Sequence, residues 1–224
     1  MSVLSVQQVS FSYRTKYQTV HAVKEVSCAM EPGTLYALVG KSGSGKTTFI
    51  SLLAGLEKPD KGTILFHGSD LGTMDIDEYR RSHASVIYQN YNLFPFLSVL
   101  ENVMYPMLLN KRTKVQAQNH AKEVLKQVGL DAHYWKRLPA MLSGGEQQRV
   151  AIARTLANNA ELILADEPTG NLDSENTHNI VDLLKKLAHE NGCTVVVVTH
   201  DEAVAAAADY VYRMDSGRLV VDEQ

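Results

Sequence analysis

A glycine-rich loop containing one lysine is the first stretch of this chain whose residue types and spacing could do chemistry. Residues 40–47 read Gly-Lys-Ser-Gly-Ser-Gly-Lys-Thr, between a short apolar run and a predicted helix. Backbone N–H groups of such a loop can surround phosphate oxygens, and a side chain at Gly43 or Gly45 would obstruct their close approach. The Lys46 ammonium can reach the β- and γ-phosphates, and the Thr47 hydroxyl can ligate Mg2+. The loop therefore predicts a nucleoside triphosphate site formed by Gly40, Ser42, Gly43, Ser44, Gly45, Lys46, Thr47 and Thr48.

Two adjacent acids follow a later apolar run. Asp166 and Glu167 come directly after residues 162–165, which read Leu-Ile-Leu-Ala. Neighbouring side chains of a strand point to different sides, so the two carboxylates can have different tasks. We expect Asp166 to hold Mg2+ and Glu167 to polarise the attacking water as a general base. Two solvated acids at a strand end are the alternative, which the upstream phosphate loop disfavours.

Three more side chains follow or lie on predicted strands. His200 comes just after the run at residues 195–198, at the end of a strand where α/β sheets bind ligands, so it could contact the γ-phosphate or orient water. Gln89 also follows a short strand, and its amide could ligate Mg2+. Tyr13 could stack on a base. For Gln89 and Tyr13, purely structural roles are equally compatible with the sequence.

A second stretch suited to anion binding lies at residues 142–146, Leu-Ser-Gly-Gly-Glu. Ser143 and Glu146 have the spacing of a capping box that opens a helix. The backbone amides of Gly144 and Gly145 would then lie at a helix N-terminus, which favours negative charge. Because the upstream loop already holds phosphates, this second site is best explained if it faces a nucleotide bound by another subunit.

The order of apolar runs and helical patterns predicts an α/β fold. Aliphatic, aromatic and β-branched runs predict strands at residues 3–13, 34–39, 63–66, 162–165 and 194–198, and a terminal hairpin at 210–221. Helical patterns occur at residues 47–56, 113–129, 143–157 and 174–191. This alternation predicts a parallel sheet flanked by helices. We expect one domain, with an α/β core at residues 1–88 and 159–224 and a helical subdomain at residues 89–158.

The composition excludes several classes of protein. The formal net charge is −3 and the 22 Lys and Arg residues are spread along the chain, so no basic footprint indicates nucleic acid. Cys28 and Cys193 are isolated, without metal-site or disulfide spacing. We find no signal peptide and no apolar run near the roughly 20 residues that span a bilayer. Any membrane spans are expected to belong to another chain.

The order of these motifs resembles the ATP-binding subunits of ABC transporters over nearly the whole chain. Residues 40–47 are similar to the phosphate loop of that family, Gln89 to its Q-loop glutamine and residues 142–146 to its signature motif. The resemblance implies ATP and Mg2+ as cofactors. It also implies a head-to-tail dimer, expected to be a homodimer, in which Ser143, Gly144, Gly145 and Glu146 of one chain face the ATP of the other.

The remaining motif residues also have counterparts in that family. Asp166 resembles its Mg2+-binding aspartate, Glu167 its catalytic glutamate and His200 its switch histidine. Residues 171–173 resemble its D-loop, which adds Asp173 to the nucleotide site, and Tyr13 resembles its adenine-stacking aromatic. The resemblance thus implies Glu167, His200 and Lys46 as catalytic groups, and Mg2+ ligands at Thr47, Gln89 and Asp166.

For the whole chain, the resemblance implies a P-loop NTPase (RecA-like) core with a small antiparallel β-subdomain and an inserted helical subdomain. In that family, transmembrane permease subunits dock on the helical subdomain near the Q-loop. The chain is therefore expected to be cytoplasmic and peripheral on the inner face of the cell membrane, held there by a permease.

A narrower resemblance concerns transporters that export. Residues 168–173, with residues 91–94 and 101–103, are similar to the lipoprotein-releasing, macrolide-efflux and antimicrobial-peptide-export ATPases, and in part to a cell-division ATPase. This predicts ATP hydrolysis that powers export, efflux or mechanical transmission. Two alternatives stay open: the ATPase of an amino-acid importer, and a soluble ABC-type ATPase of translation or DNA repair. Members of the last group usually carry paired cassettes or long coiled-coil insertions.

Overall fold

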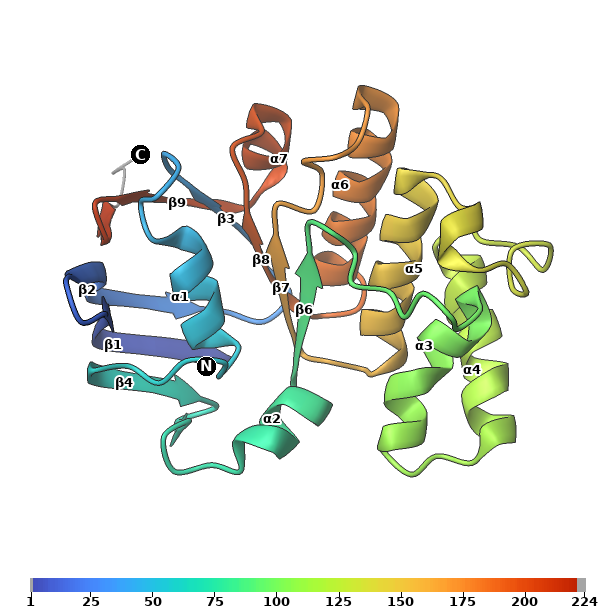
Figure 1. Cartoon of the computed structure of the whole chain (residues 1–224), viewed down its shortest axis with the longest axis horizontal. Coiled ribbons are helices and arrows are strands. Elements are labelled where there is room, and N and C mark those ends of the chain that lie inside the picture. Colours follow the sequence, from blue (N-terminus) through green and yellow to red (C-terminus); the bar gives the residue numbers. More distant parts are fainter. Residues whose placement is uncertain (1, 221–224) are drawn as a thin grey trace.

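The computed structural model describes residues 2–220 of the 224-residue chain and contains two β-sheets (Figure 1). The smaller sheet is antiparallel, with the order β2-β1-β4-β5. Its strands are β1 Leu4–Arg14, β2 Thr19–Met30, β4 Lys61–Phe66 and β5 Ser69–Asp70. The strands predicted at residues 3–13 and 63–66 correspond to β1 and β4.

The larger sheet has the order β10-β9-β3-β8-β7-β6. All its neighbouring strands are parallel except β9 and β10, which form the terminal hairpin. The strands are β3 Leu35–Val39, β6 Ala84–Tyr88, β7 Leu162–Asp166, β8 Thr194–Val198, β9 Tyr210–Asp215 and β10 Arg218–Val220. The predicted parallel sheet is confirmed; residue 221 of the predicted hairpin lies outside the described residues.

The central strands are buried on both faces, as their unbroken aliphatic runs require. In β7, Leu162 and Leu164 belong to one hydrophobic cluster, and Ile163 and Ala165 belong to another. The first cluster joins this face of the sheet to helix α1 (Lys46–Leu53) and to the antiparallel sheet. The second joins the opposite face to helix α6 (Ser174–His189) and to the helices between β6 and β7. The sheet therefore separates two hydrophobic cores, and close packing on both of its faces holds the ends of its strands in place.

Helices connect the strands and cover both faces of the larger sheet. They are α1 Lys46–Leu53, α2 Ile76–Ser82, α3 Val99–Leu109, α4 Lys114–Gln127, α5 Gly144–Ala157, α6 Ser174–His189 and α7 Glu202–Ala207, with a 3-10 turn η1 Pro139–Met141. Between β6 and β7 the chain forms α3, α4, η1 and α5, which lie together at one end of the molecule (Figure 1). Within residues 2–220, no helix is long and apolar enough to cross a bilayer.

Side-chain caps define the starts of the long helices. The predicted capping boxes at Thr113 and Ser143 are both present. A third, which was not predicted from the sequence, opens α3 at Ser98, where the Glu101 carboxylate accepts from the Ser98 backbone N–H at 2.9 Å. Each cap satisfies N–H groups that the first turn of a helix leaves unpaired.

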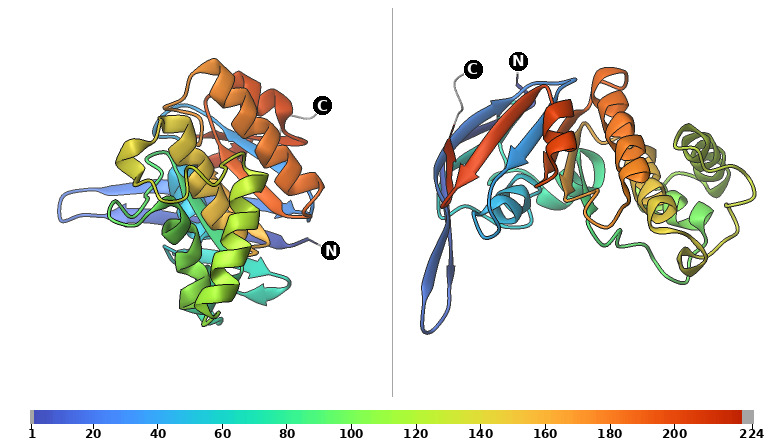
Figure 2. Two further views of the ribbon diagram at one scale, coloured as in Figure 1. Left: turned by 90° about the vertical axis from the view of Figure 1, so that its right-hand side faces the viewer. Right: turned by 90° about the horizontal axis from the view of Figure 1, so that it is seen from above.

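Strand β2 was not predicted from the sequence. It pairs with β1 in a long hairpin that projects from the rest of the molecule (Figure 2). The hairpin matters for the site because Tyr13 lies on β1, and because β2 runs close to the phosphate loop.

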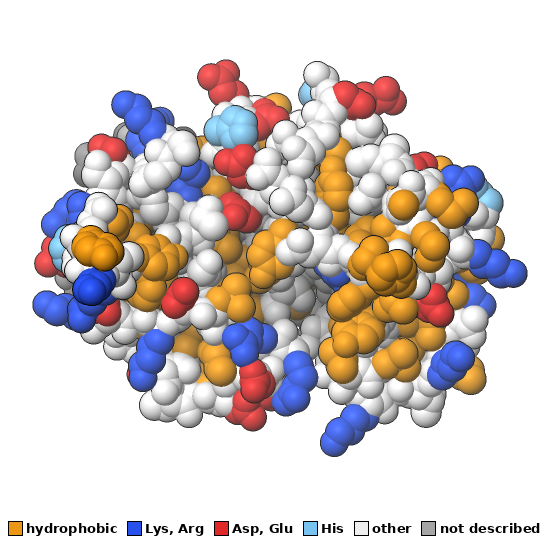
Figure 3. Space-filling model, viewed as in Figure 1, with side chains coloured by type: hydrophobic (Ala, Val, Ile, Leu, Met, Phe, Trp, Pro, Cys, Tyr) orange, Lys and Arg blue, Asp and Glu red, His pale blue; other side chains and the backbone are white. Residues whose placement is uncertain are grey.

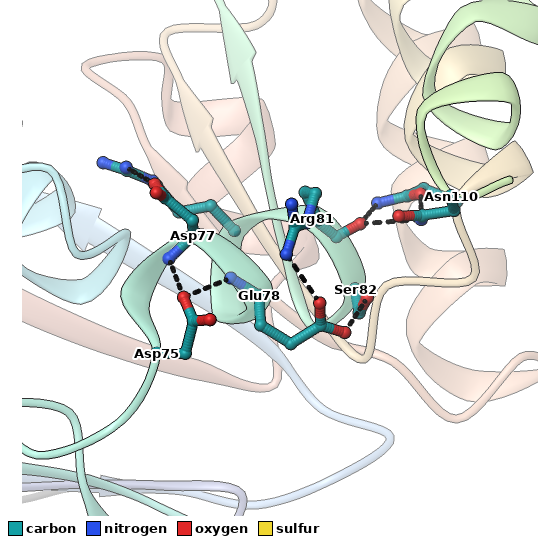
Figure 4. A network of polar contacts seen from close by, with 8 residues as sticks. Asp75, Asp77, Glu78, Arg81, Ser82 and Asn110 are labelled. Atoms are coloured by element: carbon teal, nitrogen blue, oxygen red, sulfur yellow. Dashed lines mark hydrogen bonds and ion pairs between the residues drawn. The ribbon is translucent and has the colours of Figure 1, made fainter.

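A polar network joins α2 to the helices beyond β6 (Figure 4). The Asp75 carboxylate caps α2 by accepting from the N–H groups of Asp77 and Glu78, at 3.0 and 3.1 Å. At the other end of α2, the backbone carbonyl of Arg81 accepts from the side-chain amides of Asn110 and Asn158. The ends of α3 and α5 are therefore fastened to α2.

Candidate nucleotide-binding site

The phosphate loop, residues 40–47, connects the end of β3 to the start of α1. Its glycines are required by the surrounding backbone as well as by access for a phosphate. Gly45 has φ +106°, and a Cβ there would lie 2.2 Å from the backbone oxygen of Ala22 on β2. Gly43 has φ +77°, and no atom lies within 4 Å of the position that a Cβ would take, so backbone conformation alone requires glycine there. The loop is thus shaped by its own protein neighbours.

Two polar side chains of the loop are available to an anion. Lys46 is only 7% exposed, and its Nζ donates to the backbone oxygens of Gly40 at 2.8 Å and Lys41 at 3.0 Å. The Ser44 hydroxyl is buried without a hydrogen-bond partner in the described chain. A buried polar atom without a partner is rare and costly in a folded protein. A phosphate oxygen in the loop would satisfy it.

An oxygen pair lies where the loop meets β7. Thr47 Oγ1 donates to Asp166 Oδ1 at 3.3 Å. Burial raises the pKa of Asp166, and the neighbouring Glu167 carboxylate raises it further. A hydroxyl and a carboxylate are ligands that Mg2+ accepts, and a cation there would offset the cost of burying the charge. Within residues 2–220, no group of three His, Cys, Asp or Glu side chains could hold a metal ion without other ligands.

Glu167 and His200 meet at the ends of β7 and β8. Glu167 has φ +48°, and its N–H donates to the backbone oxygen of Val198 at 2.9 Å. Its Oε2 lies 3.1 Å from Nδ1 of His200. Left-handed backbone at a residue other than glycine costs energy and recurs at functional sites. The geometry presents one carboxylate and one imidazole side by side, a pair able to accept and hold a proton.

Gln89 and Tyr13 flank these groups from two directions. A Cβ on Gly170 would lie 2.9 Å from Gln89 Nε2 and 3.4 Å from Glu167 Oε2, so the glutamine amide lies beside the loop that follows β7. Tyr13 Oη lies 3.4 Å from Thr48 Oγ1 on α1, and Tyr13 is 44% exposed. The structure therefore puts an accessible aromatic ring beside the phosphate loop.

The signature motif, residues 142–146, lies away from the phosphate loop of its own chain. A Cβ on Gly144 would lie 2.9 Å from Tyr91 Oη, and a Cβ on Gly145 would lie 2.4 Å from Asn176 Oδ1. Figure 1 shows α5 and α1 separated by β6 and β7. The two glycines thus permit close packing inside the chain, a role the sequence did not reveal. None of the neighbouring atoms found around them belongs to residues 40–47.

Two motif carboxylates have local structural partners. The Glu146 carboxylate accepts from the Ser143 backbone N–H at 2.7 Å in the capping box of α5. Asp173 is the N-cap of α6 and accepts from the Asn176 backbone N–H at 2.8 Å, which lowers the pKa of Asp173. Both residues order helix starts in this chain; their contact with a nucleotide stays a prediction.

The fold and this site define an ATP-binding protein of the phosphate-loop class. A family model described as "ABC transporter" matches residues 23–170, well over half of the chain. The chain belongs to the ABC transporter family, as an ATP-binding and ATP-hydrolysing subunit. Its fold, with a RecA-like core, an antiparallel sheet and inserted helices as predicted, is that of solved ABC cassettes.

Relatives along the full length carry consistent names. The lipoprotein-releasing system ATP-binding protein LolD of Francisella tularensis (subspecies holarctica, strain OSU18) is 42% identical over 222 residues, covering 97% of this chain and 95% of LolD. A LolD of Shewanella sp. (strain MR-7) is 43% identical over 220 residues, covering 97% and 95%. The uncharacterized ABC transporter ATP-binding protein YclH of Bacillus subtilis (strain 168) is 37% identical, covering 100% and 98%.

Solved structures agree over the same span. The bacterial ABC transporter cassette MJ0796, in a dimeric structure, superimposes with a TM-score of 0.91 at 36% identity, covering 99% of this chain and 98% of that chain. A dimeric post-hydrolysis structure of MJ0796 bound to ADP and Pi gives a TM-score of 0.90 at 36% identity, with the same coverage.

Proposed function

We propose that this chain powers export, efflux or mechanical transmission through separate membrane subunits, by hydrolysing ATP in the presence of Mg2+. The meeting of Glu167 and His200 beside the Thr47–Asp166 pair carries this proposal. Three strand ends of one sheet deliver these groups, so a single bound nucleotide can touch them all. The export direction is supported by the resemblance to LolD, whose name states lipoprotein release.

Each site residue has one task in the proposed reaction. Tyr13 stacks on adenine, and Lys46 with the loop amides binds the β- and γ-phosphates. Thr47, Asp166 and Gln89 hold Mg2+, which neutralises phosphate charge when it is bound. Glu167 takes a proton from the attacking water, and His200 orients that water and the γ-phosphate.

The proposed active form is a head-to-tail dimer of two copies of this chain. The observation that supports it is the separation of the signature motif, residues 142–146, from the phosphate loop of the same chain. A helix N-terminus favours an anion, and the second copy provides one in its bound ATP. The dimeric MJ0796 cassette is similar along the full chain.

A permease is the proposed membrane partner, and it docks on the helical part of the chain at the cytoplasmic face of the membrane. Large apolar side chains are exposed there: Phe94, Phe96, Tyr105, Leu108 and Leu109. Figure 3 shows hydrophobic side chains gathered over α3 and the segment before it. Phe96 is 90% exposed, and apolar surface of this kind is typical of protein interfaces.

Co-purification tests the partner and the direction together. The chain is expressed with an affinity tag in its native organism and isolated from detergent-solubilised membranes. Phe96→Asp tests the docking surface. Val115→Asp on α4, which also replaces an exposed apolar side chain by an acid, is the control. We expect the wild-type chain and Val115→Asp to co-purify with a permease that has about four spans and a large external domain. Phe96→Asp should not co-purify with it. Recovery of an importer permease with a substrate-binding protein would contradict export.

A further inference from the structure

The segment after β6, residues 89–94, carries strain in the structure. Tyr91 and Asn92 have φ +61° and +45°, so two successive residues other than glycine adopt the left-handed region. This conformation is unfavourable for residues other than glycine, less so for asparagine, and it persists where surrounding contacts hold it. Some group must therefore fix this segment.

Arg154 on α5 holds the segment from outside, in addition to the local hydrogen bonds that the N–H groups of Tyr91 and Asn92 donate to the backbone oxygens of Tyr88 and Asn90. Its Nη1 donates to the backbone oxygen of Asn92 at 2.7 Å, and its Nη2 donates to the backbone oxygen of Tyr91 at 3.0 Å. Burial lowers the pKa of Arg154, and both terminal nitrogens of its guanidinium are committed to these backbone oxygens. The planar fork of the arginine thus holds two successive peptides at once.

The fixed segment contacts residues that belong to both ATP sites of the proposed head-to-tail dimer. At its start, the backbone oxygen of Gln89 accepts from Asn171 Nδ2 at 3.2 Å, next to the loop that carries Glu167. Two residues further on, the hydroxyl of Tyr91 packs against Gly144 in the signature motif. Arg154 lies near the far end of the same helix, α5, that begins at Gly144. The segment and the helix are therefore joined at two places.

We propose that Arg154 is a positioning residue for ATP hydrolysis. By holding Tyr91 and Asn92, it fixes the distance between Gln89 in the chain's own ATP site and Gly144, which faces the ATP of the second copy. The inference rests on the proposed head-to-tail dimer.

The test compares Arg154→Met and Arg154→Lys with a matched control, Arg112→Met. Methionine keeps the length of the side chain, while lysine keeps the charge but has one donor nitrogen in place of the planar pair of nitrogens of arginine. The Arg112 guanidinium donates to the Met107 sulfur, at 3.8 Å, at the end of α3. Urea unfolding followed by fluorescence of the single tryptophan, Trp135, establishes that each variant is folded under assay conditions.

For both Arg154 variants we expect kcat to fall by roughly 10- to 100-fold, because the catalytic groups are misplaced by about 1 Å. The Kd for ATP should change less than about threefold, because the phosphate loop and Tyr13 are untouched. In a Glu167→Gln background, the ATP-induced dimer should weaken with both variants. Arg112→Met should match the wild type in all three measurements.

A second pair of variants tests the contact between Tyr91 and Gly144 without altering the arginine. Gly144→Ala adds a methyl group 2.9 Å from the Tyr91 hydroxyl, and Tyr91→Phe removes that hydroxyl. We expect ATP-dependent dimerisation lost in Gly144→Ala to be partly restored in the double variant, a non-additivity that a purely local defect does not give.

Three results would overturn the inference: folded Arg154 variants with kcat within twofold of wild type, a loss of ATP affinity as large as the loss of kcat, or strict additivity of the glycine and tyrosine changes. Failure of the wild-type chain to dimerise with ATP would instead contradict the proposed function itself. The two failures are therefore distinguishable.

Discussion

At the scale of single residues, Glu167 occupies a conformation that its neighbours impose. Its left-handed backbone is held by the hydrogen bond from its N–H to Val198, and its carboxylate is 3.1 Å from His200. Glu167→Gln keeps the shape but removes the base. We expect hydrolysis to fall by roughly 10²-fold or more while ATP still binds. Phosphate release and equilibrium ATP binding measure the two quantities, and near-normal turnover would contradict the role.

Lys46 tests the phosphate loop in the same way. Its ammonium is buried over the loop and donates to two backbone oxygens, so its removal takes a fixed cation from the phosphates. Lys46→Ala should weaken ATP binding by roughly 10- to 100-fold, the range of a lost charged hydrogen bond. Calorimetry with Lys41→Ala as the control, whose side chain is exposed on the same loop, checks this. Equal affinity for both variants would count against the assignment.

At the scale of elements, an acid between two histidines fastens the antiparallel sheet to the parallel one. Glu161, just before β7, lies 2.8 Å from His67 Nε2 after β4 and 3.4 Å from His83 Nδ1 before β6. Burial alone raises the pKa of Glu161, but the hydrogen bonds from His67 and His83 outweigh it and leave the pKa below its ordinary value. The ionised form of Glu161 is therefore favoured by folding.

This shift predicts how stability depends on pH. A carboxyl group whose pKa is lower in the folded state stabilises the protein above its unfolded pKa of about 4.3, and that stability is lost as pH falls through the folded pKa. Glu161→Gln should thus lower the melting temperature at pH 7, and the gap to wild type should narrow below about pH 4.3. The measurement is the melting temperature of wild type and Glu161→Gln across this pH range, with Glu123→Gln, at an exposed position, as the control. A gap independent of pH would contradict the ionic contribution.

The elements that could be predicted from the sequence are those with one unbroken pattern. The aliphatic runs of β3, β7 and β8 and the capped helices α4 and α5 are of this kind. The valines of β2, by contrast, recur at residues 20, 23 and 26, with Glu25 at φ +52° between them. Register shifts between β1 and β2 accompany this irregularity, so neither a strand period nor a helix period appears.

The candidate site could be predicted wherever a motif lies at the end of a strand. Parallel strands end at one edge of the sheet, and there the structure brings Thr47 to Asp166 and Glu167 to His200. The contacts of Arg154 could not be predicted, because its partners are backbone oxygens 62 and 63 residues away. Every residue has a backbone carbonyl, so a hydrogen bond to one does not restrict the partner's residue type. Such a contact therefore leaves no pattern in the sequence.

At the scale of the whole molecule, the two parts of the proposed ATP site lie in different cores. Phe49 and Leu52 lie on α1, which follows the phosphate loop, and belong to the cluster that includes the antiparallel sheet. Val150 and Ile152 lie on α5, which follows Ser143, and belong to the other cluster. Because these cores lie on opposite faces of the sheet, the loop and residues 142–146 of one chain are held apart. We therefore propose that completing the site requires a second copy.

Sedimentation of Ser143→Arg with a fluorescent ATP analogue tests this requirement most directly. The variant is made in a Glu167→Gln background, where bound nucleotide is not hydrolysed. In the parent, nucleotide should sediment with a dimer. With Ser143→Arg, a bulky cation replaces the N-cap of α5 on the face offered to the second copy, so nucleotide should sediment with the monomer at nearly unchanged affinity. Loss of nucleotide from a folded Ser143→Arg monomer would put the signature motif in its own chain's site and contradict the head-to-tail dimer.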